Sequence, residues 1–132
     1  MELKVGIKGR EEYIVREEML ASAIGSGMID VFSTPYMVAL MESTAQLSVA
    51  DAVGEGNVTV GTKLDISHLA ATPLGMGVYA ESELLEVDGR RLVFKVAAYD
   101  ECGLIGEGMH ERFIVAAEKF VAKCQAKLQK NG

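Results

Sequence analysis

The stretch that decides the fold is Pro35-Tyr-Met-Val-Ala-Leu-Met-Glu42-Ser-Thr-Ala-Gln-Leu-Ser-Val-Ala50, one of the most apolar segments of the chain. Ser33 and Thr34 precede it. A hydroxyl residue followed by proline is typical of a helix start. The hydroxyl caps the helix, and proline is tolerated in the first turn because a backbone N–H there has no partner within the helix. The pattern predicts a helix of about 20 residues that runs to Val53 and stops at Gly54. Apolar residues cover more than one of its faces, so we expect it to be buried on most sides.

Glu42 is the charged residue within this apolar segment. At helical spacing it shares a face with Val38, Ala45 and Val49. An ionised carboxylate on a buried face loses hydration, so a structural role would require a buried cation or several hydrogen-bond donors. Residues placed in this way are more often functional than structural, and Glu42 is therefore the first catalytic candidate.

The residues after the helix predict an antiparallel sheet. Alternation over 58–68 predicts a strand whose inward row is Val58, Val60, Thr62, Leu64, Ile66 and His68. Three further strands are expected over 76–87, 90–100 and 104–115, with hairpin turns at Asp88-Gly89 and Cys102-Gly103. A long buried helix combined with these strands predicts an α+β fold in which the sheet curls around the helix.

The two ends of the chain carry shorter elements. Residues 17–25 are expected to form a short helix, and the following Gly25-Ser-Gly27 is flexible by composition, as a lid would be. Residues 116–130 are predicted to form a C-terminal helix, whose lysine side is interpreted as a solvated face rather than a phosphate-binding patch. The curled sheet leaves an edge strand and a helix face open, which predicts a homodimer.

Composition limits the class of protein. The 132 residues form one predicted domain, 1–132, and 49% of them are hydrophobic, which excludes a disordered chain. A net charge of −6 argues against a nucleic-acid partner. No apolar run approaches a membrane span, and the N-terminus lacks the apolar core of a signal peptide. With only Cys102 and Cys124, we expect reduced thiols in a cytoplasmic protein.

Several classes of site are excluded by their motifs. The segment His110-Glu-Arg-Phe-Ile114 begins like the zinc motif His-Glu-x-x-His, but an isoleucine occupies the second ligand position. The sequence has no cysteine pair with metal spacing and no phosphate-binding glycine loop. The sequence therefore predicts neither a metal nor another cofactor.

Four residues remain as candidates for chemistry: Thr34, Glu42, His68 and Arg112. A carboxylate on the central helix and an imidazole on the inner sheet face could meet and perform acid–base chemistry, although a lone core histidine is more often structural. Thr34 is explained by helix capping alone, but a helix N-terminus also suits a developing oxyanion. Thr34 and Glu42 are separated by about 12 Å along a regular helix, so either Thr34 folds back or the site spans two subunits.

Four motifs stand in order along the chain: Ser33-Thr34-Pro-Tyr-Met-Val-Ala-Leu-Met-Glu42, Val60-Gly61-Thr-Lys-Leu-Asp-Ile-Ser-His68-Leu-Ala-Ala-Thr-Pro73, Val87-Asp-Gly-Arg-Arg-Leu92 and Ile105-Gly-Glu-Gly-Met-His-Glu-Arg112. Their order and spacing closely resemble the fluoroacetyl-CoA thioesterase family of hotdog-fold proteins. The resemblance extends over most of the chain, from about Gly6 to Lys123.

This resemblance implies a homodimeric hotdog fold that acts on acyl-CoA thioesters. It implies a Thr–Glu–His catalytic set, which falls on Thr34, Glu42 and His68. It also matches Gly61 to a backbone position that faces the acyl group, and Arg112 to an arginine near the site.

Two departures from the family concern the lid. Pro35 stands where the fluoroacetyl-specific enzyme has glycine, and Gly25 and Met28 replace phenylalanines. An aromatic gate that senses fluorine is not expected, whereas the flexible Met28 side chain favours a permissive acyl pocket. The sequence thus predicts a thioesterase for short or medium acyl-CoA without fluoroacetyl selectivity. The alternatives are a hotdog dehydratase or hydratase and a non-catalytic acyl-CoA-binding module.

Overall fold

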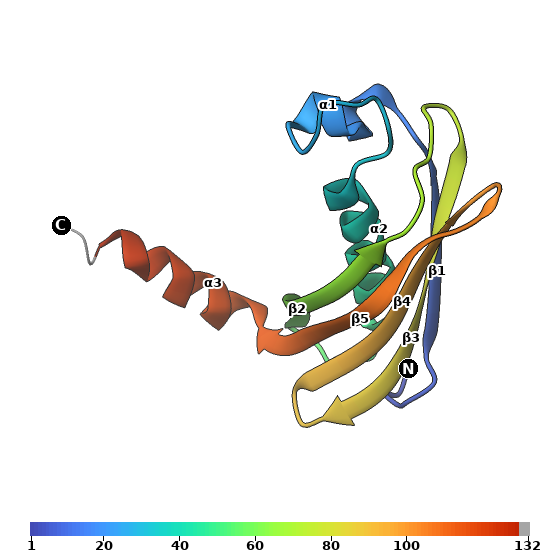
Figure 1. Cartoon of the computed structure of the whole chain (residues 1–132). Helices are drawn as coiled ribbons and strands as arrows, with labels where there is room; N and C mark the ends of the chain where they lie inside the picture. The colour runs from blue at the N-terminus through green and yellow to red at the C-terminus, as the bar shows by residue number, and fades with distance from the viewer. Residues whose placement is uncertain (130–132) are drawn as a thin grey trace.

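The computed structural model describes residues 1–129 and contains five strands and three α-helices (Figure 1). In chain order the elements are β1 (Lys8–Ile14), a 3₁₀ turn (Glu17–Met19), α1 (Ala21–Ile24), α2 (Thr34–Val49), β2 (Asn57–His68), β3 (Gly77–Asp88), β4 (Arg91–Asp100), β5 (Gly103–Ala116), α3 (Ala117–Gln125) and a second 3₁₀ turn (Ala126–Leu128). The predicted strands and hairpins over 58–115 are confirmed, with bounds that differ by at most one residue.

The strands form a single antiparallel sheet in the order β1-β3-β4-β5-β2. The sheet curves around α2, which lies in its concave side (Figure 1). This is the α+β arrangement that the sequence predicts. The two edge strands differ in charge. The exposed side chains of β1 include Lys8, Arg10 and Glu12, whereas the row of side chains on β2 that ends at His68 is less charged.

Helix α2 begins as predicted but ends earlier. The Ser33 side chain is the cap and accepts a hydrogen bond from the backbone N–H of Tyr36 at 3.3 Å, so Thr34 is the first helical residue and its hydroxyl is not needed for capping. The helix has 16 residues and stops at Val49, four residues before the predicted end. The remaining residues form a turn, in which the Asn57 side chain donates to the carbonyl of Val53.

The core forms where one face of α2 meets the sheet. The fully buried side chains of α2 are Met37, Leu40, Met41, Ala45 and Val49. They pack against buried residues of the three central strands, among them Leu84, Leu92, Phe94 and Ile105. Burial of this aliphatic surface is the main stabilising contribution, at about 1.5–3 kcal/mol for each large side chain.

Strand β2 contains a bulge that corrects the predicted inward row. Its register with β5 shifts between Gly61 and Lys63. Before the shift Thr59 is buried and Val58 is 46% exposed, so the predicted row is wrong there; after the shift Ile66 packs against the core as predicted. One extra residue reverses the alternation of side chains, because successive residues of a strand point to opposite faces. Gly61 and His68, an odd and an even position, therefore share the inner face.

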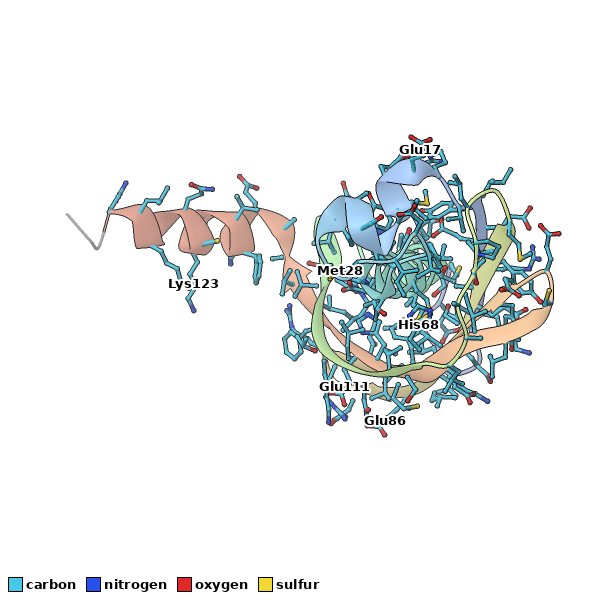
Figure 2. All side chains as sticks on the ribbon, turned by 45° about the horizontal axis from the view of Figure 1, so that its top comes forward. Glu17, Met28, His68, Glu86, Glu111 and Lys123 are labelled. Carbon is cyan, nitrogen blue, oxygen red and sulfur yellow. The ribbon has the colours of Figure 1, made fainter. Side chains whose placement is uncertain are left out.

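Helix α3 continues directly from β5 and extends away from the sheet, beyond the edge strand β2 (Figure 1). None of its residues is buried, and Lys123 points into solvent (Figure 2). The predicted C-terminal helix over 116–130 is confirmed to Leu128, and its last residue lies outside the described part. Among residues 1–129, no helix has the length and apolar character to span a membrane.

Candidate active site

Thr34 and His68 meet at the end of the molecule where α2 begins and β2 ends. The Thr34 Oγ1 lies 2.6 Å from the His68 Nδ1, which is a short hydrogen bond between side chains 34 positions apart. Figure 2 shows His68 within the body of the molecule. A surface cavity of about 340 Å³ opens beside this pair and is lined by residues of α1, the start of α2 and the segment after His68. The sequence predicted that His68 would meet Glu42, but within this protomer the side chain that bonds to His68 is Thr34, and Glu42 pairs with Arg112 instead.

The other ring nitrogen of His68 is free. Its Nε2 is buried and has no hydrogen-bond partner among the described residues. Burial lowers the pKa of His68 below its ordinary value, and the nearby backbone of Ala70 opposes this effect only in part. The ring is therefore neutral near pH 7, and a neutral ring can accept or relay a proton.

Glu42 lies on the third turn of α2, on the side that faces β2 and β5. Its Oε2 is 3.7 Å from the Nη1 of Arg112, and its side chain is 37% exposed. The carboxylate is thus half-buried in the protomer, where the sequence predicted a buried one. Gly61 lies against the same oxygen, since a Cβ added to this glycine would be 2.7 Å from it.

Arg112 is the buried cation that Glu42 requires. Its side chain is 7% exposed. The Nε donates to Thr59 Oγ1 at 2.8 Å, and Nη2 donates to the Thr59 carbonyl at 2.9 Å. Burial lowers the pKa of Arg112 and the nearby Glu42 carboxylate opposes this effect. The distance between Arg112 Nη1 and Glu42 Oε2 is that of an ion pair but exceeds hydrogen-bond length, so the lone pairs of the carboxylate stay available.

The candidates thus form two groups within one protomer. Thr34 and His68 form the first, and Glu42, Gly61 and Arg112 form the second; no hydrogen bond or ion pair joins them among residues 1–129. The length of α2 between Thr34 and Glu42 explains the separation, since Thr34 is helical and does not fold back. Met28 is 97% exposed on the loop after α1.

Sequence reasoning missed His110, which it used only to exclude a zinc motif. The ring is fully buried and its Nε2 lies 3.2 Å from Arg112 Nη1. The alternation of β5 places His110 and Arg112 on the same inner face, and this spacing of two was the available signal. The described residues contain no group of three or more acidic, histidine or cysteine side chains that could hold a metal ion.

Comparison with known proteins identifies the family. The model of the fluoroacetyl-CoA-specific thioesterase family matches residues 15–118, a range that includes every candidate residue. A curated fluoroacetyl-CoA thioesterase from Streptantibioticus cattleyicolor is 42% identical over 98 residues, which are 74% of this chain and 70% of that protein. The chain belongs to this family.

Solved structures agree with this assignment. A crystal structure of the fluoroacetyl-CoA thioesterase superposes with a TM-score of 0.91 at 33% identity and covers 96% of this chain and 98% of that one. A thioesterase superfamily member from Thermus thermophilus gives 0.88 at 28% identity, with 96% and 94% covered. A hot-dog-like protein from Thermanaerovibrio acidaminovorans, at 23% identity and a TM-score of 0.85 over 95% and 93%, shares the fold. The predicted hotdog fold and thioester hydrolase class are confirmed.

We predict that Gly61→Ala lowers kcat about tenfold or more while thermal stability changes little. The new methyl group must displace the Glu42 carboxylate, which is the movable end of a flexible side chain, and misplaced catalytic groups lose rate steeply. Gly61 does not have a positive φ, so the backbone tolerates alanine. Steady-state kinetics and thermal unfolding of the wild type and the Gly61→Ala variant test this prediction. Gly56→Ala is not a suitable control, because the φ of Gly56 is positive. Unchanged kcat would show that Glu42 is not held against Gly61 during turnover.

Proposed function

We propose that this chain hydrolyses short or medium acyl-CoA thioesters to the free acid and CoA. The observation that carries the proposal is the Thr34–His68 contact, with its neutral ring and a free Nε2 beside an open cavity. A related thioesterase variant has been solved with fluoroacetate and CoA, and its structure superposes with a TM-score of 0.84 at 33% identity over 89% of this chain and 99% of that one. This likeness supports CoA thioesters as the substrate class.

Thr34, Glu42 and His68 are the proposed catalytic residues. Glu42 attacks the thioester carbonyl or removes a proton from the attacking water, so that a C–O bond forms as the C–S bond breaks. His68 starts as a neutral ring, takes up the proton that the attacking water releases, directly or through Glu42, and passes it to the leaving thiolate, while the Thr34 hydroxyl orients the ring or the substrate. The backbone of Gly61 faces the acyl group, and Arg112 sustains the negative charge of Glu42.

The proposed assembly is a homodimer that brings the two groups of residues together. Edge strand β2 is 12 residues long, and an exposed strand of this length is a template for pairing with a second chain. Exposed apolar side chains lie at or near this edge, namely Leu47, Val58, Leu64 and Leu69. Helix α3 extends past the same edge with Phe120 and Val121 exposed, as expected if it contacts a partner.

We also propose that the enzyme lacks fluoroacetyl selectivity. Gly25 ends α1 with a φ of 78°, a conformation that a phenylalanine would adopt only with strain. The adjoining Met28 is a flexible, exposed side chain rather than a rigid aromatic one. Cys102 and Cys124 are exposed and unpaired, which supports action in a reducing compartment such as the cytoplasm.

The first test measures thiol release from acetyl-, propionyl-, butyryl- and fluoroacetyl-CoA. We expect hydrolysis of ordinary acyl-CoA, and Glu42→Gln should lower turnover at least about a hundredfold because an amide cannot act as base or nucleophile. Ser43→Gln, one position along the same helix, is the matched control and should retain activity. A preference for fluoroacetyl-CoA above about a thousandfold would refute the proposed permissive pocket.

Other products would identify other functions. Binding of acyl-CoA without thiol release would indicate a binding module. Hydration of an enoyl-CoA in place of thioester cleavage would indicate a hydratase. Either result would overturn the proposed hydrolysis.

A second prediction concerns pH. Burial lowers the pKa of His68. Its ring therefore becomes protonated only at pH values below the ordinary histidine pKa of about 6.5. We therefore expect kcat/KM to be constant near pH 7 and to fall as the pH decreases through the folded pKa. His68→Gln should keep the fold and lose this acid limb. The same pH profile in the variant would show that His68 is not the titrating group.

The third prediction concerns assembly. Sedimentation should give about twice the chain mass of 14.2 kDa. Charge placed on the pairing edge by Val58→Lys and Leu64→Lys should yield monomers, because buried lysines at an interface lack partners. Leu85→Lys, on the exposed side of β3, is the control and should stay dimeric. An active wild-type monomer would contradict a site shared between subunits.

A further inference from the structure

We propose that His110 is a positioning residue, which holds the guanidinium of Arg112 so that it faces Glu42 without bonding to it. The inference rests on the proposed function, because it assigns His110 a part in the catalysis by Glu42. His110 acts through two partners, Lys63 on β2 and Arg112 on its own strand.

The bonding of His110 allows one protonation state only. Its Nδ1 lies 2.8 Å from the backbone carbonyl of Lys63, and a carbonyl only accepts, so Nδ1 carries the hydrogen. Its Nε2 lies 3.2 Å from Nη1 of Arg112, which only donates, so Nε2 is the acceptor. The ring is thus a neutral bridge that receives a hydrogen bond from Arg112 and gives one to β2.

Charge keeps the bridge neutral. A protonated ring would place a second cation and a second donor against the guanidinium of Arg112. Burial lowers the pKa of His110 and the charge of Arg112 lowers it further, against the opposing effects of the Lys63 carbonyl, Glu42 and Glu111. No other inner-face residue of β5 contacts both Lys63 and Arg112 among residues 1–129.

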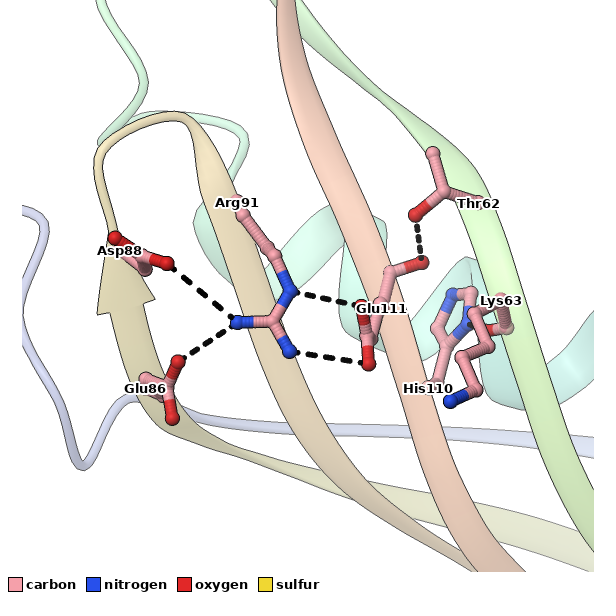
Figure 3. A network of polar contacts seen from close by, with 7 residues as sticks. All are labelled: Thr62, Lys63, Glu86, Asp88, Arg91, His110 and Glu111. Carbon is pink, nitrogen blue, oxygen red and sulfur yellow. Dashed lines mark hydrogen bonds and ion pairs between the residues drawn. The ribbon is translucent and has the colours of Figure 1, made fainter.

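The partner of His110 on β2, Lys63, links the bridge to the bulge of that strand. Lys63 is the first residue after the bulge that turns Gly61 toward Glu42. Figure 3 shows the His110 ring of β5 beside Lys63, with Thr62 and Glu111 bonded between the same strands. His110 therefore connects the bulge to Arg112, and both of these features lie against the Glu42 carboxylate.

The guanidinium of Arg112 is oriented from two sides. Thr59 accepts from Nε and Nη2, and His110 accepts from Nη1, which leaves Nη1 at 3.7 Å from Glu42. Without the acceptor on His110, Nη1 is free to approach Glu42 and form a direct hydrogen bond. That bond would occupy the lone pairs that the reaction needs, and it would lower kcat more than it changes KM.

Two substitutions separate the ends of the bridge. In His110→Gln the amide oxygen reaches the position of Nε2 and can accept from Arg112. In His110→Asn the amide nitrogen occupies the position of Nδ1 and keeps only the Lys63 contact. We expect kcat to fall less than about threefold in His110→Gln and about tenfold or more in His110→Asn, with KM within about threefold in both.

Controls distinguish positioning from loss of packing. Phe94 is fully buried, and its ring centroid lies 6.3 Å from that of His110, so Phe94→Leu perturbs the same core without touching the bridge. It should lower the unfolding temperature while kcat is retained. A double variant His110→Asn with Arg112→Lys should lose no more kcat than Arg112→Lys alone, since residues that act through one another are not additive.

Each outcome decides the proposal. It is overturned if the folded Asn variant keeps wild-type kcat, if Gln and Asn variants lose activity equally, if the double variant is additive, or if Phe94→Leu reproduces the kcat loss. If His110→Asn does not fold, His110→Leu, which removes the contacts with both Lys63 and Arg112, takes its place. If no variant folds, including Gln, His110 is purely structural and the proposal fails.

The proposed function fails separately. If the wild-type protein releases no CoA, there is no catalysis for His110 to support. The bridge is then tested by unfolding free energies. Non-additivity between His110→Asn and Arg112→Lys would support the bridge as a structural link, and additivity would refute it.

Discussion

The burial of the Arg112 guanidinium is the constraint on which the site depends. A cation almost wholly out of water must have its N–H groups bonded and its charge balanced. Thr59 and His110 bind the N–H groups from the sheet, and Glu42 supplies the negative charge from α2. The sheet and the central helix are thus joined by electrostatics as well as by the aliphatic core.

The bulge in β2 meets a second requirement of the same site. In a regular strand Gly61 and His68 would point to opposite faces, since they are an odd number of positions apart. The extra residue between Gly61 and Lys63 places both on the concave side, so both lie on the face that packs against α2. Two groups of the site have free bonding capacity, His68 Nε2 and the Glu42 carboxylate, and we assign the chemistry to them.

Helix α2 explains why one protomer keeps these groups apart. Thr34 occupies its first turn and Glu42 its third, and a straight helix cannot shorten the distance between them. A second copy at the β2 edge is therefore the assembly that we propose for a complete site. Exposed apolar side chains and the start of α3 also lie at the β2 edge. One interface would therefore cover the edge strand, these side chains and the start of the helix.

The sequence by itself determined the elements whose signals are local: the Ser33–Pro35 helix start, the strands and turns of β3 to β5, and the candidates Thr34, Glu42 and His68. Tertiary structure alone decided the inward face of β2, the half-exposure of Glu42 and the contacts of His110 with Lys63 and Arg112. The physical reason is the separation along the chain between the residues that determine each feature. Strand alternation is read from neighbouring residues, but a bulge is defined by the register with another strand. The partners of the buried polar side chains, Lys63 for His110 and Thr59 for Arg112, are 47 and 53 positions away in the chain.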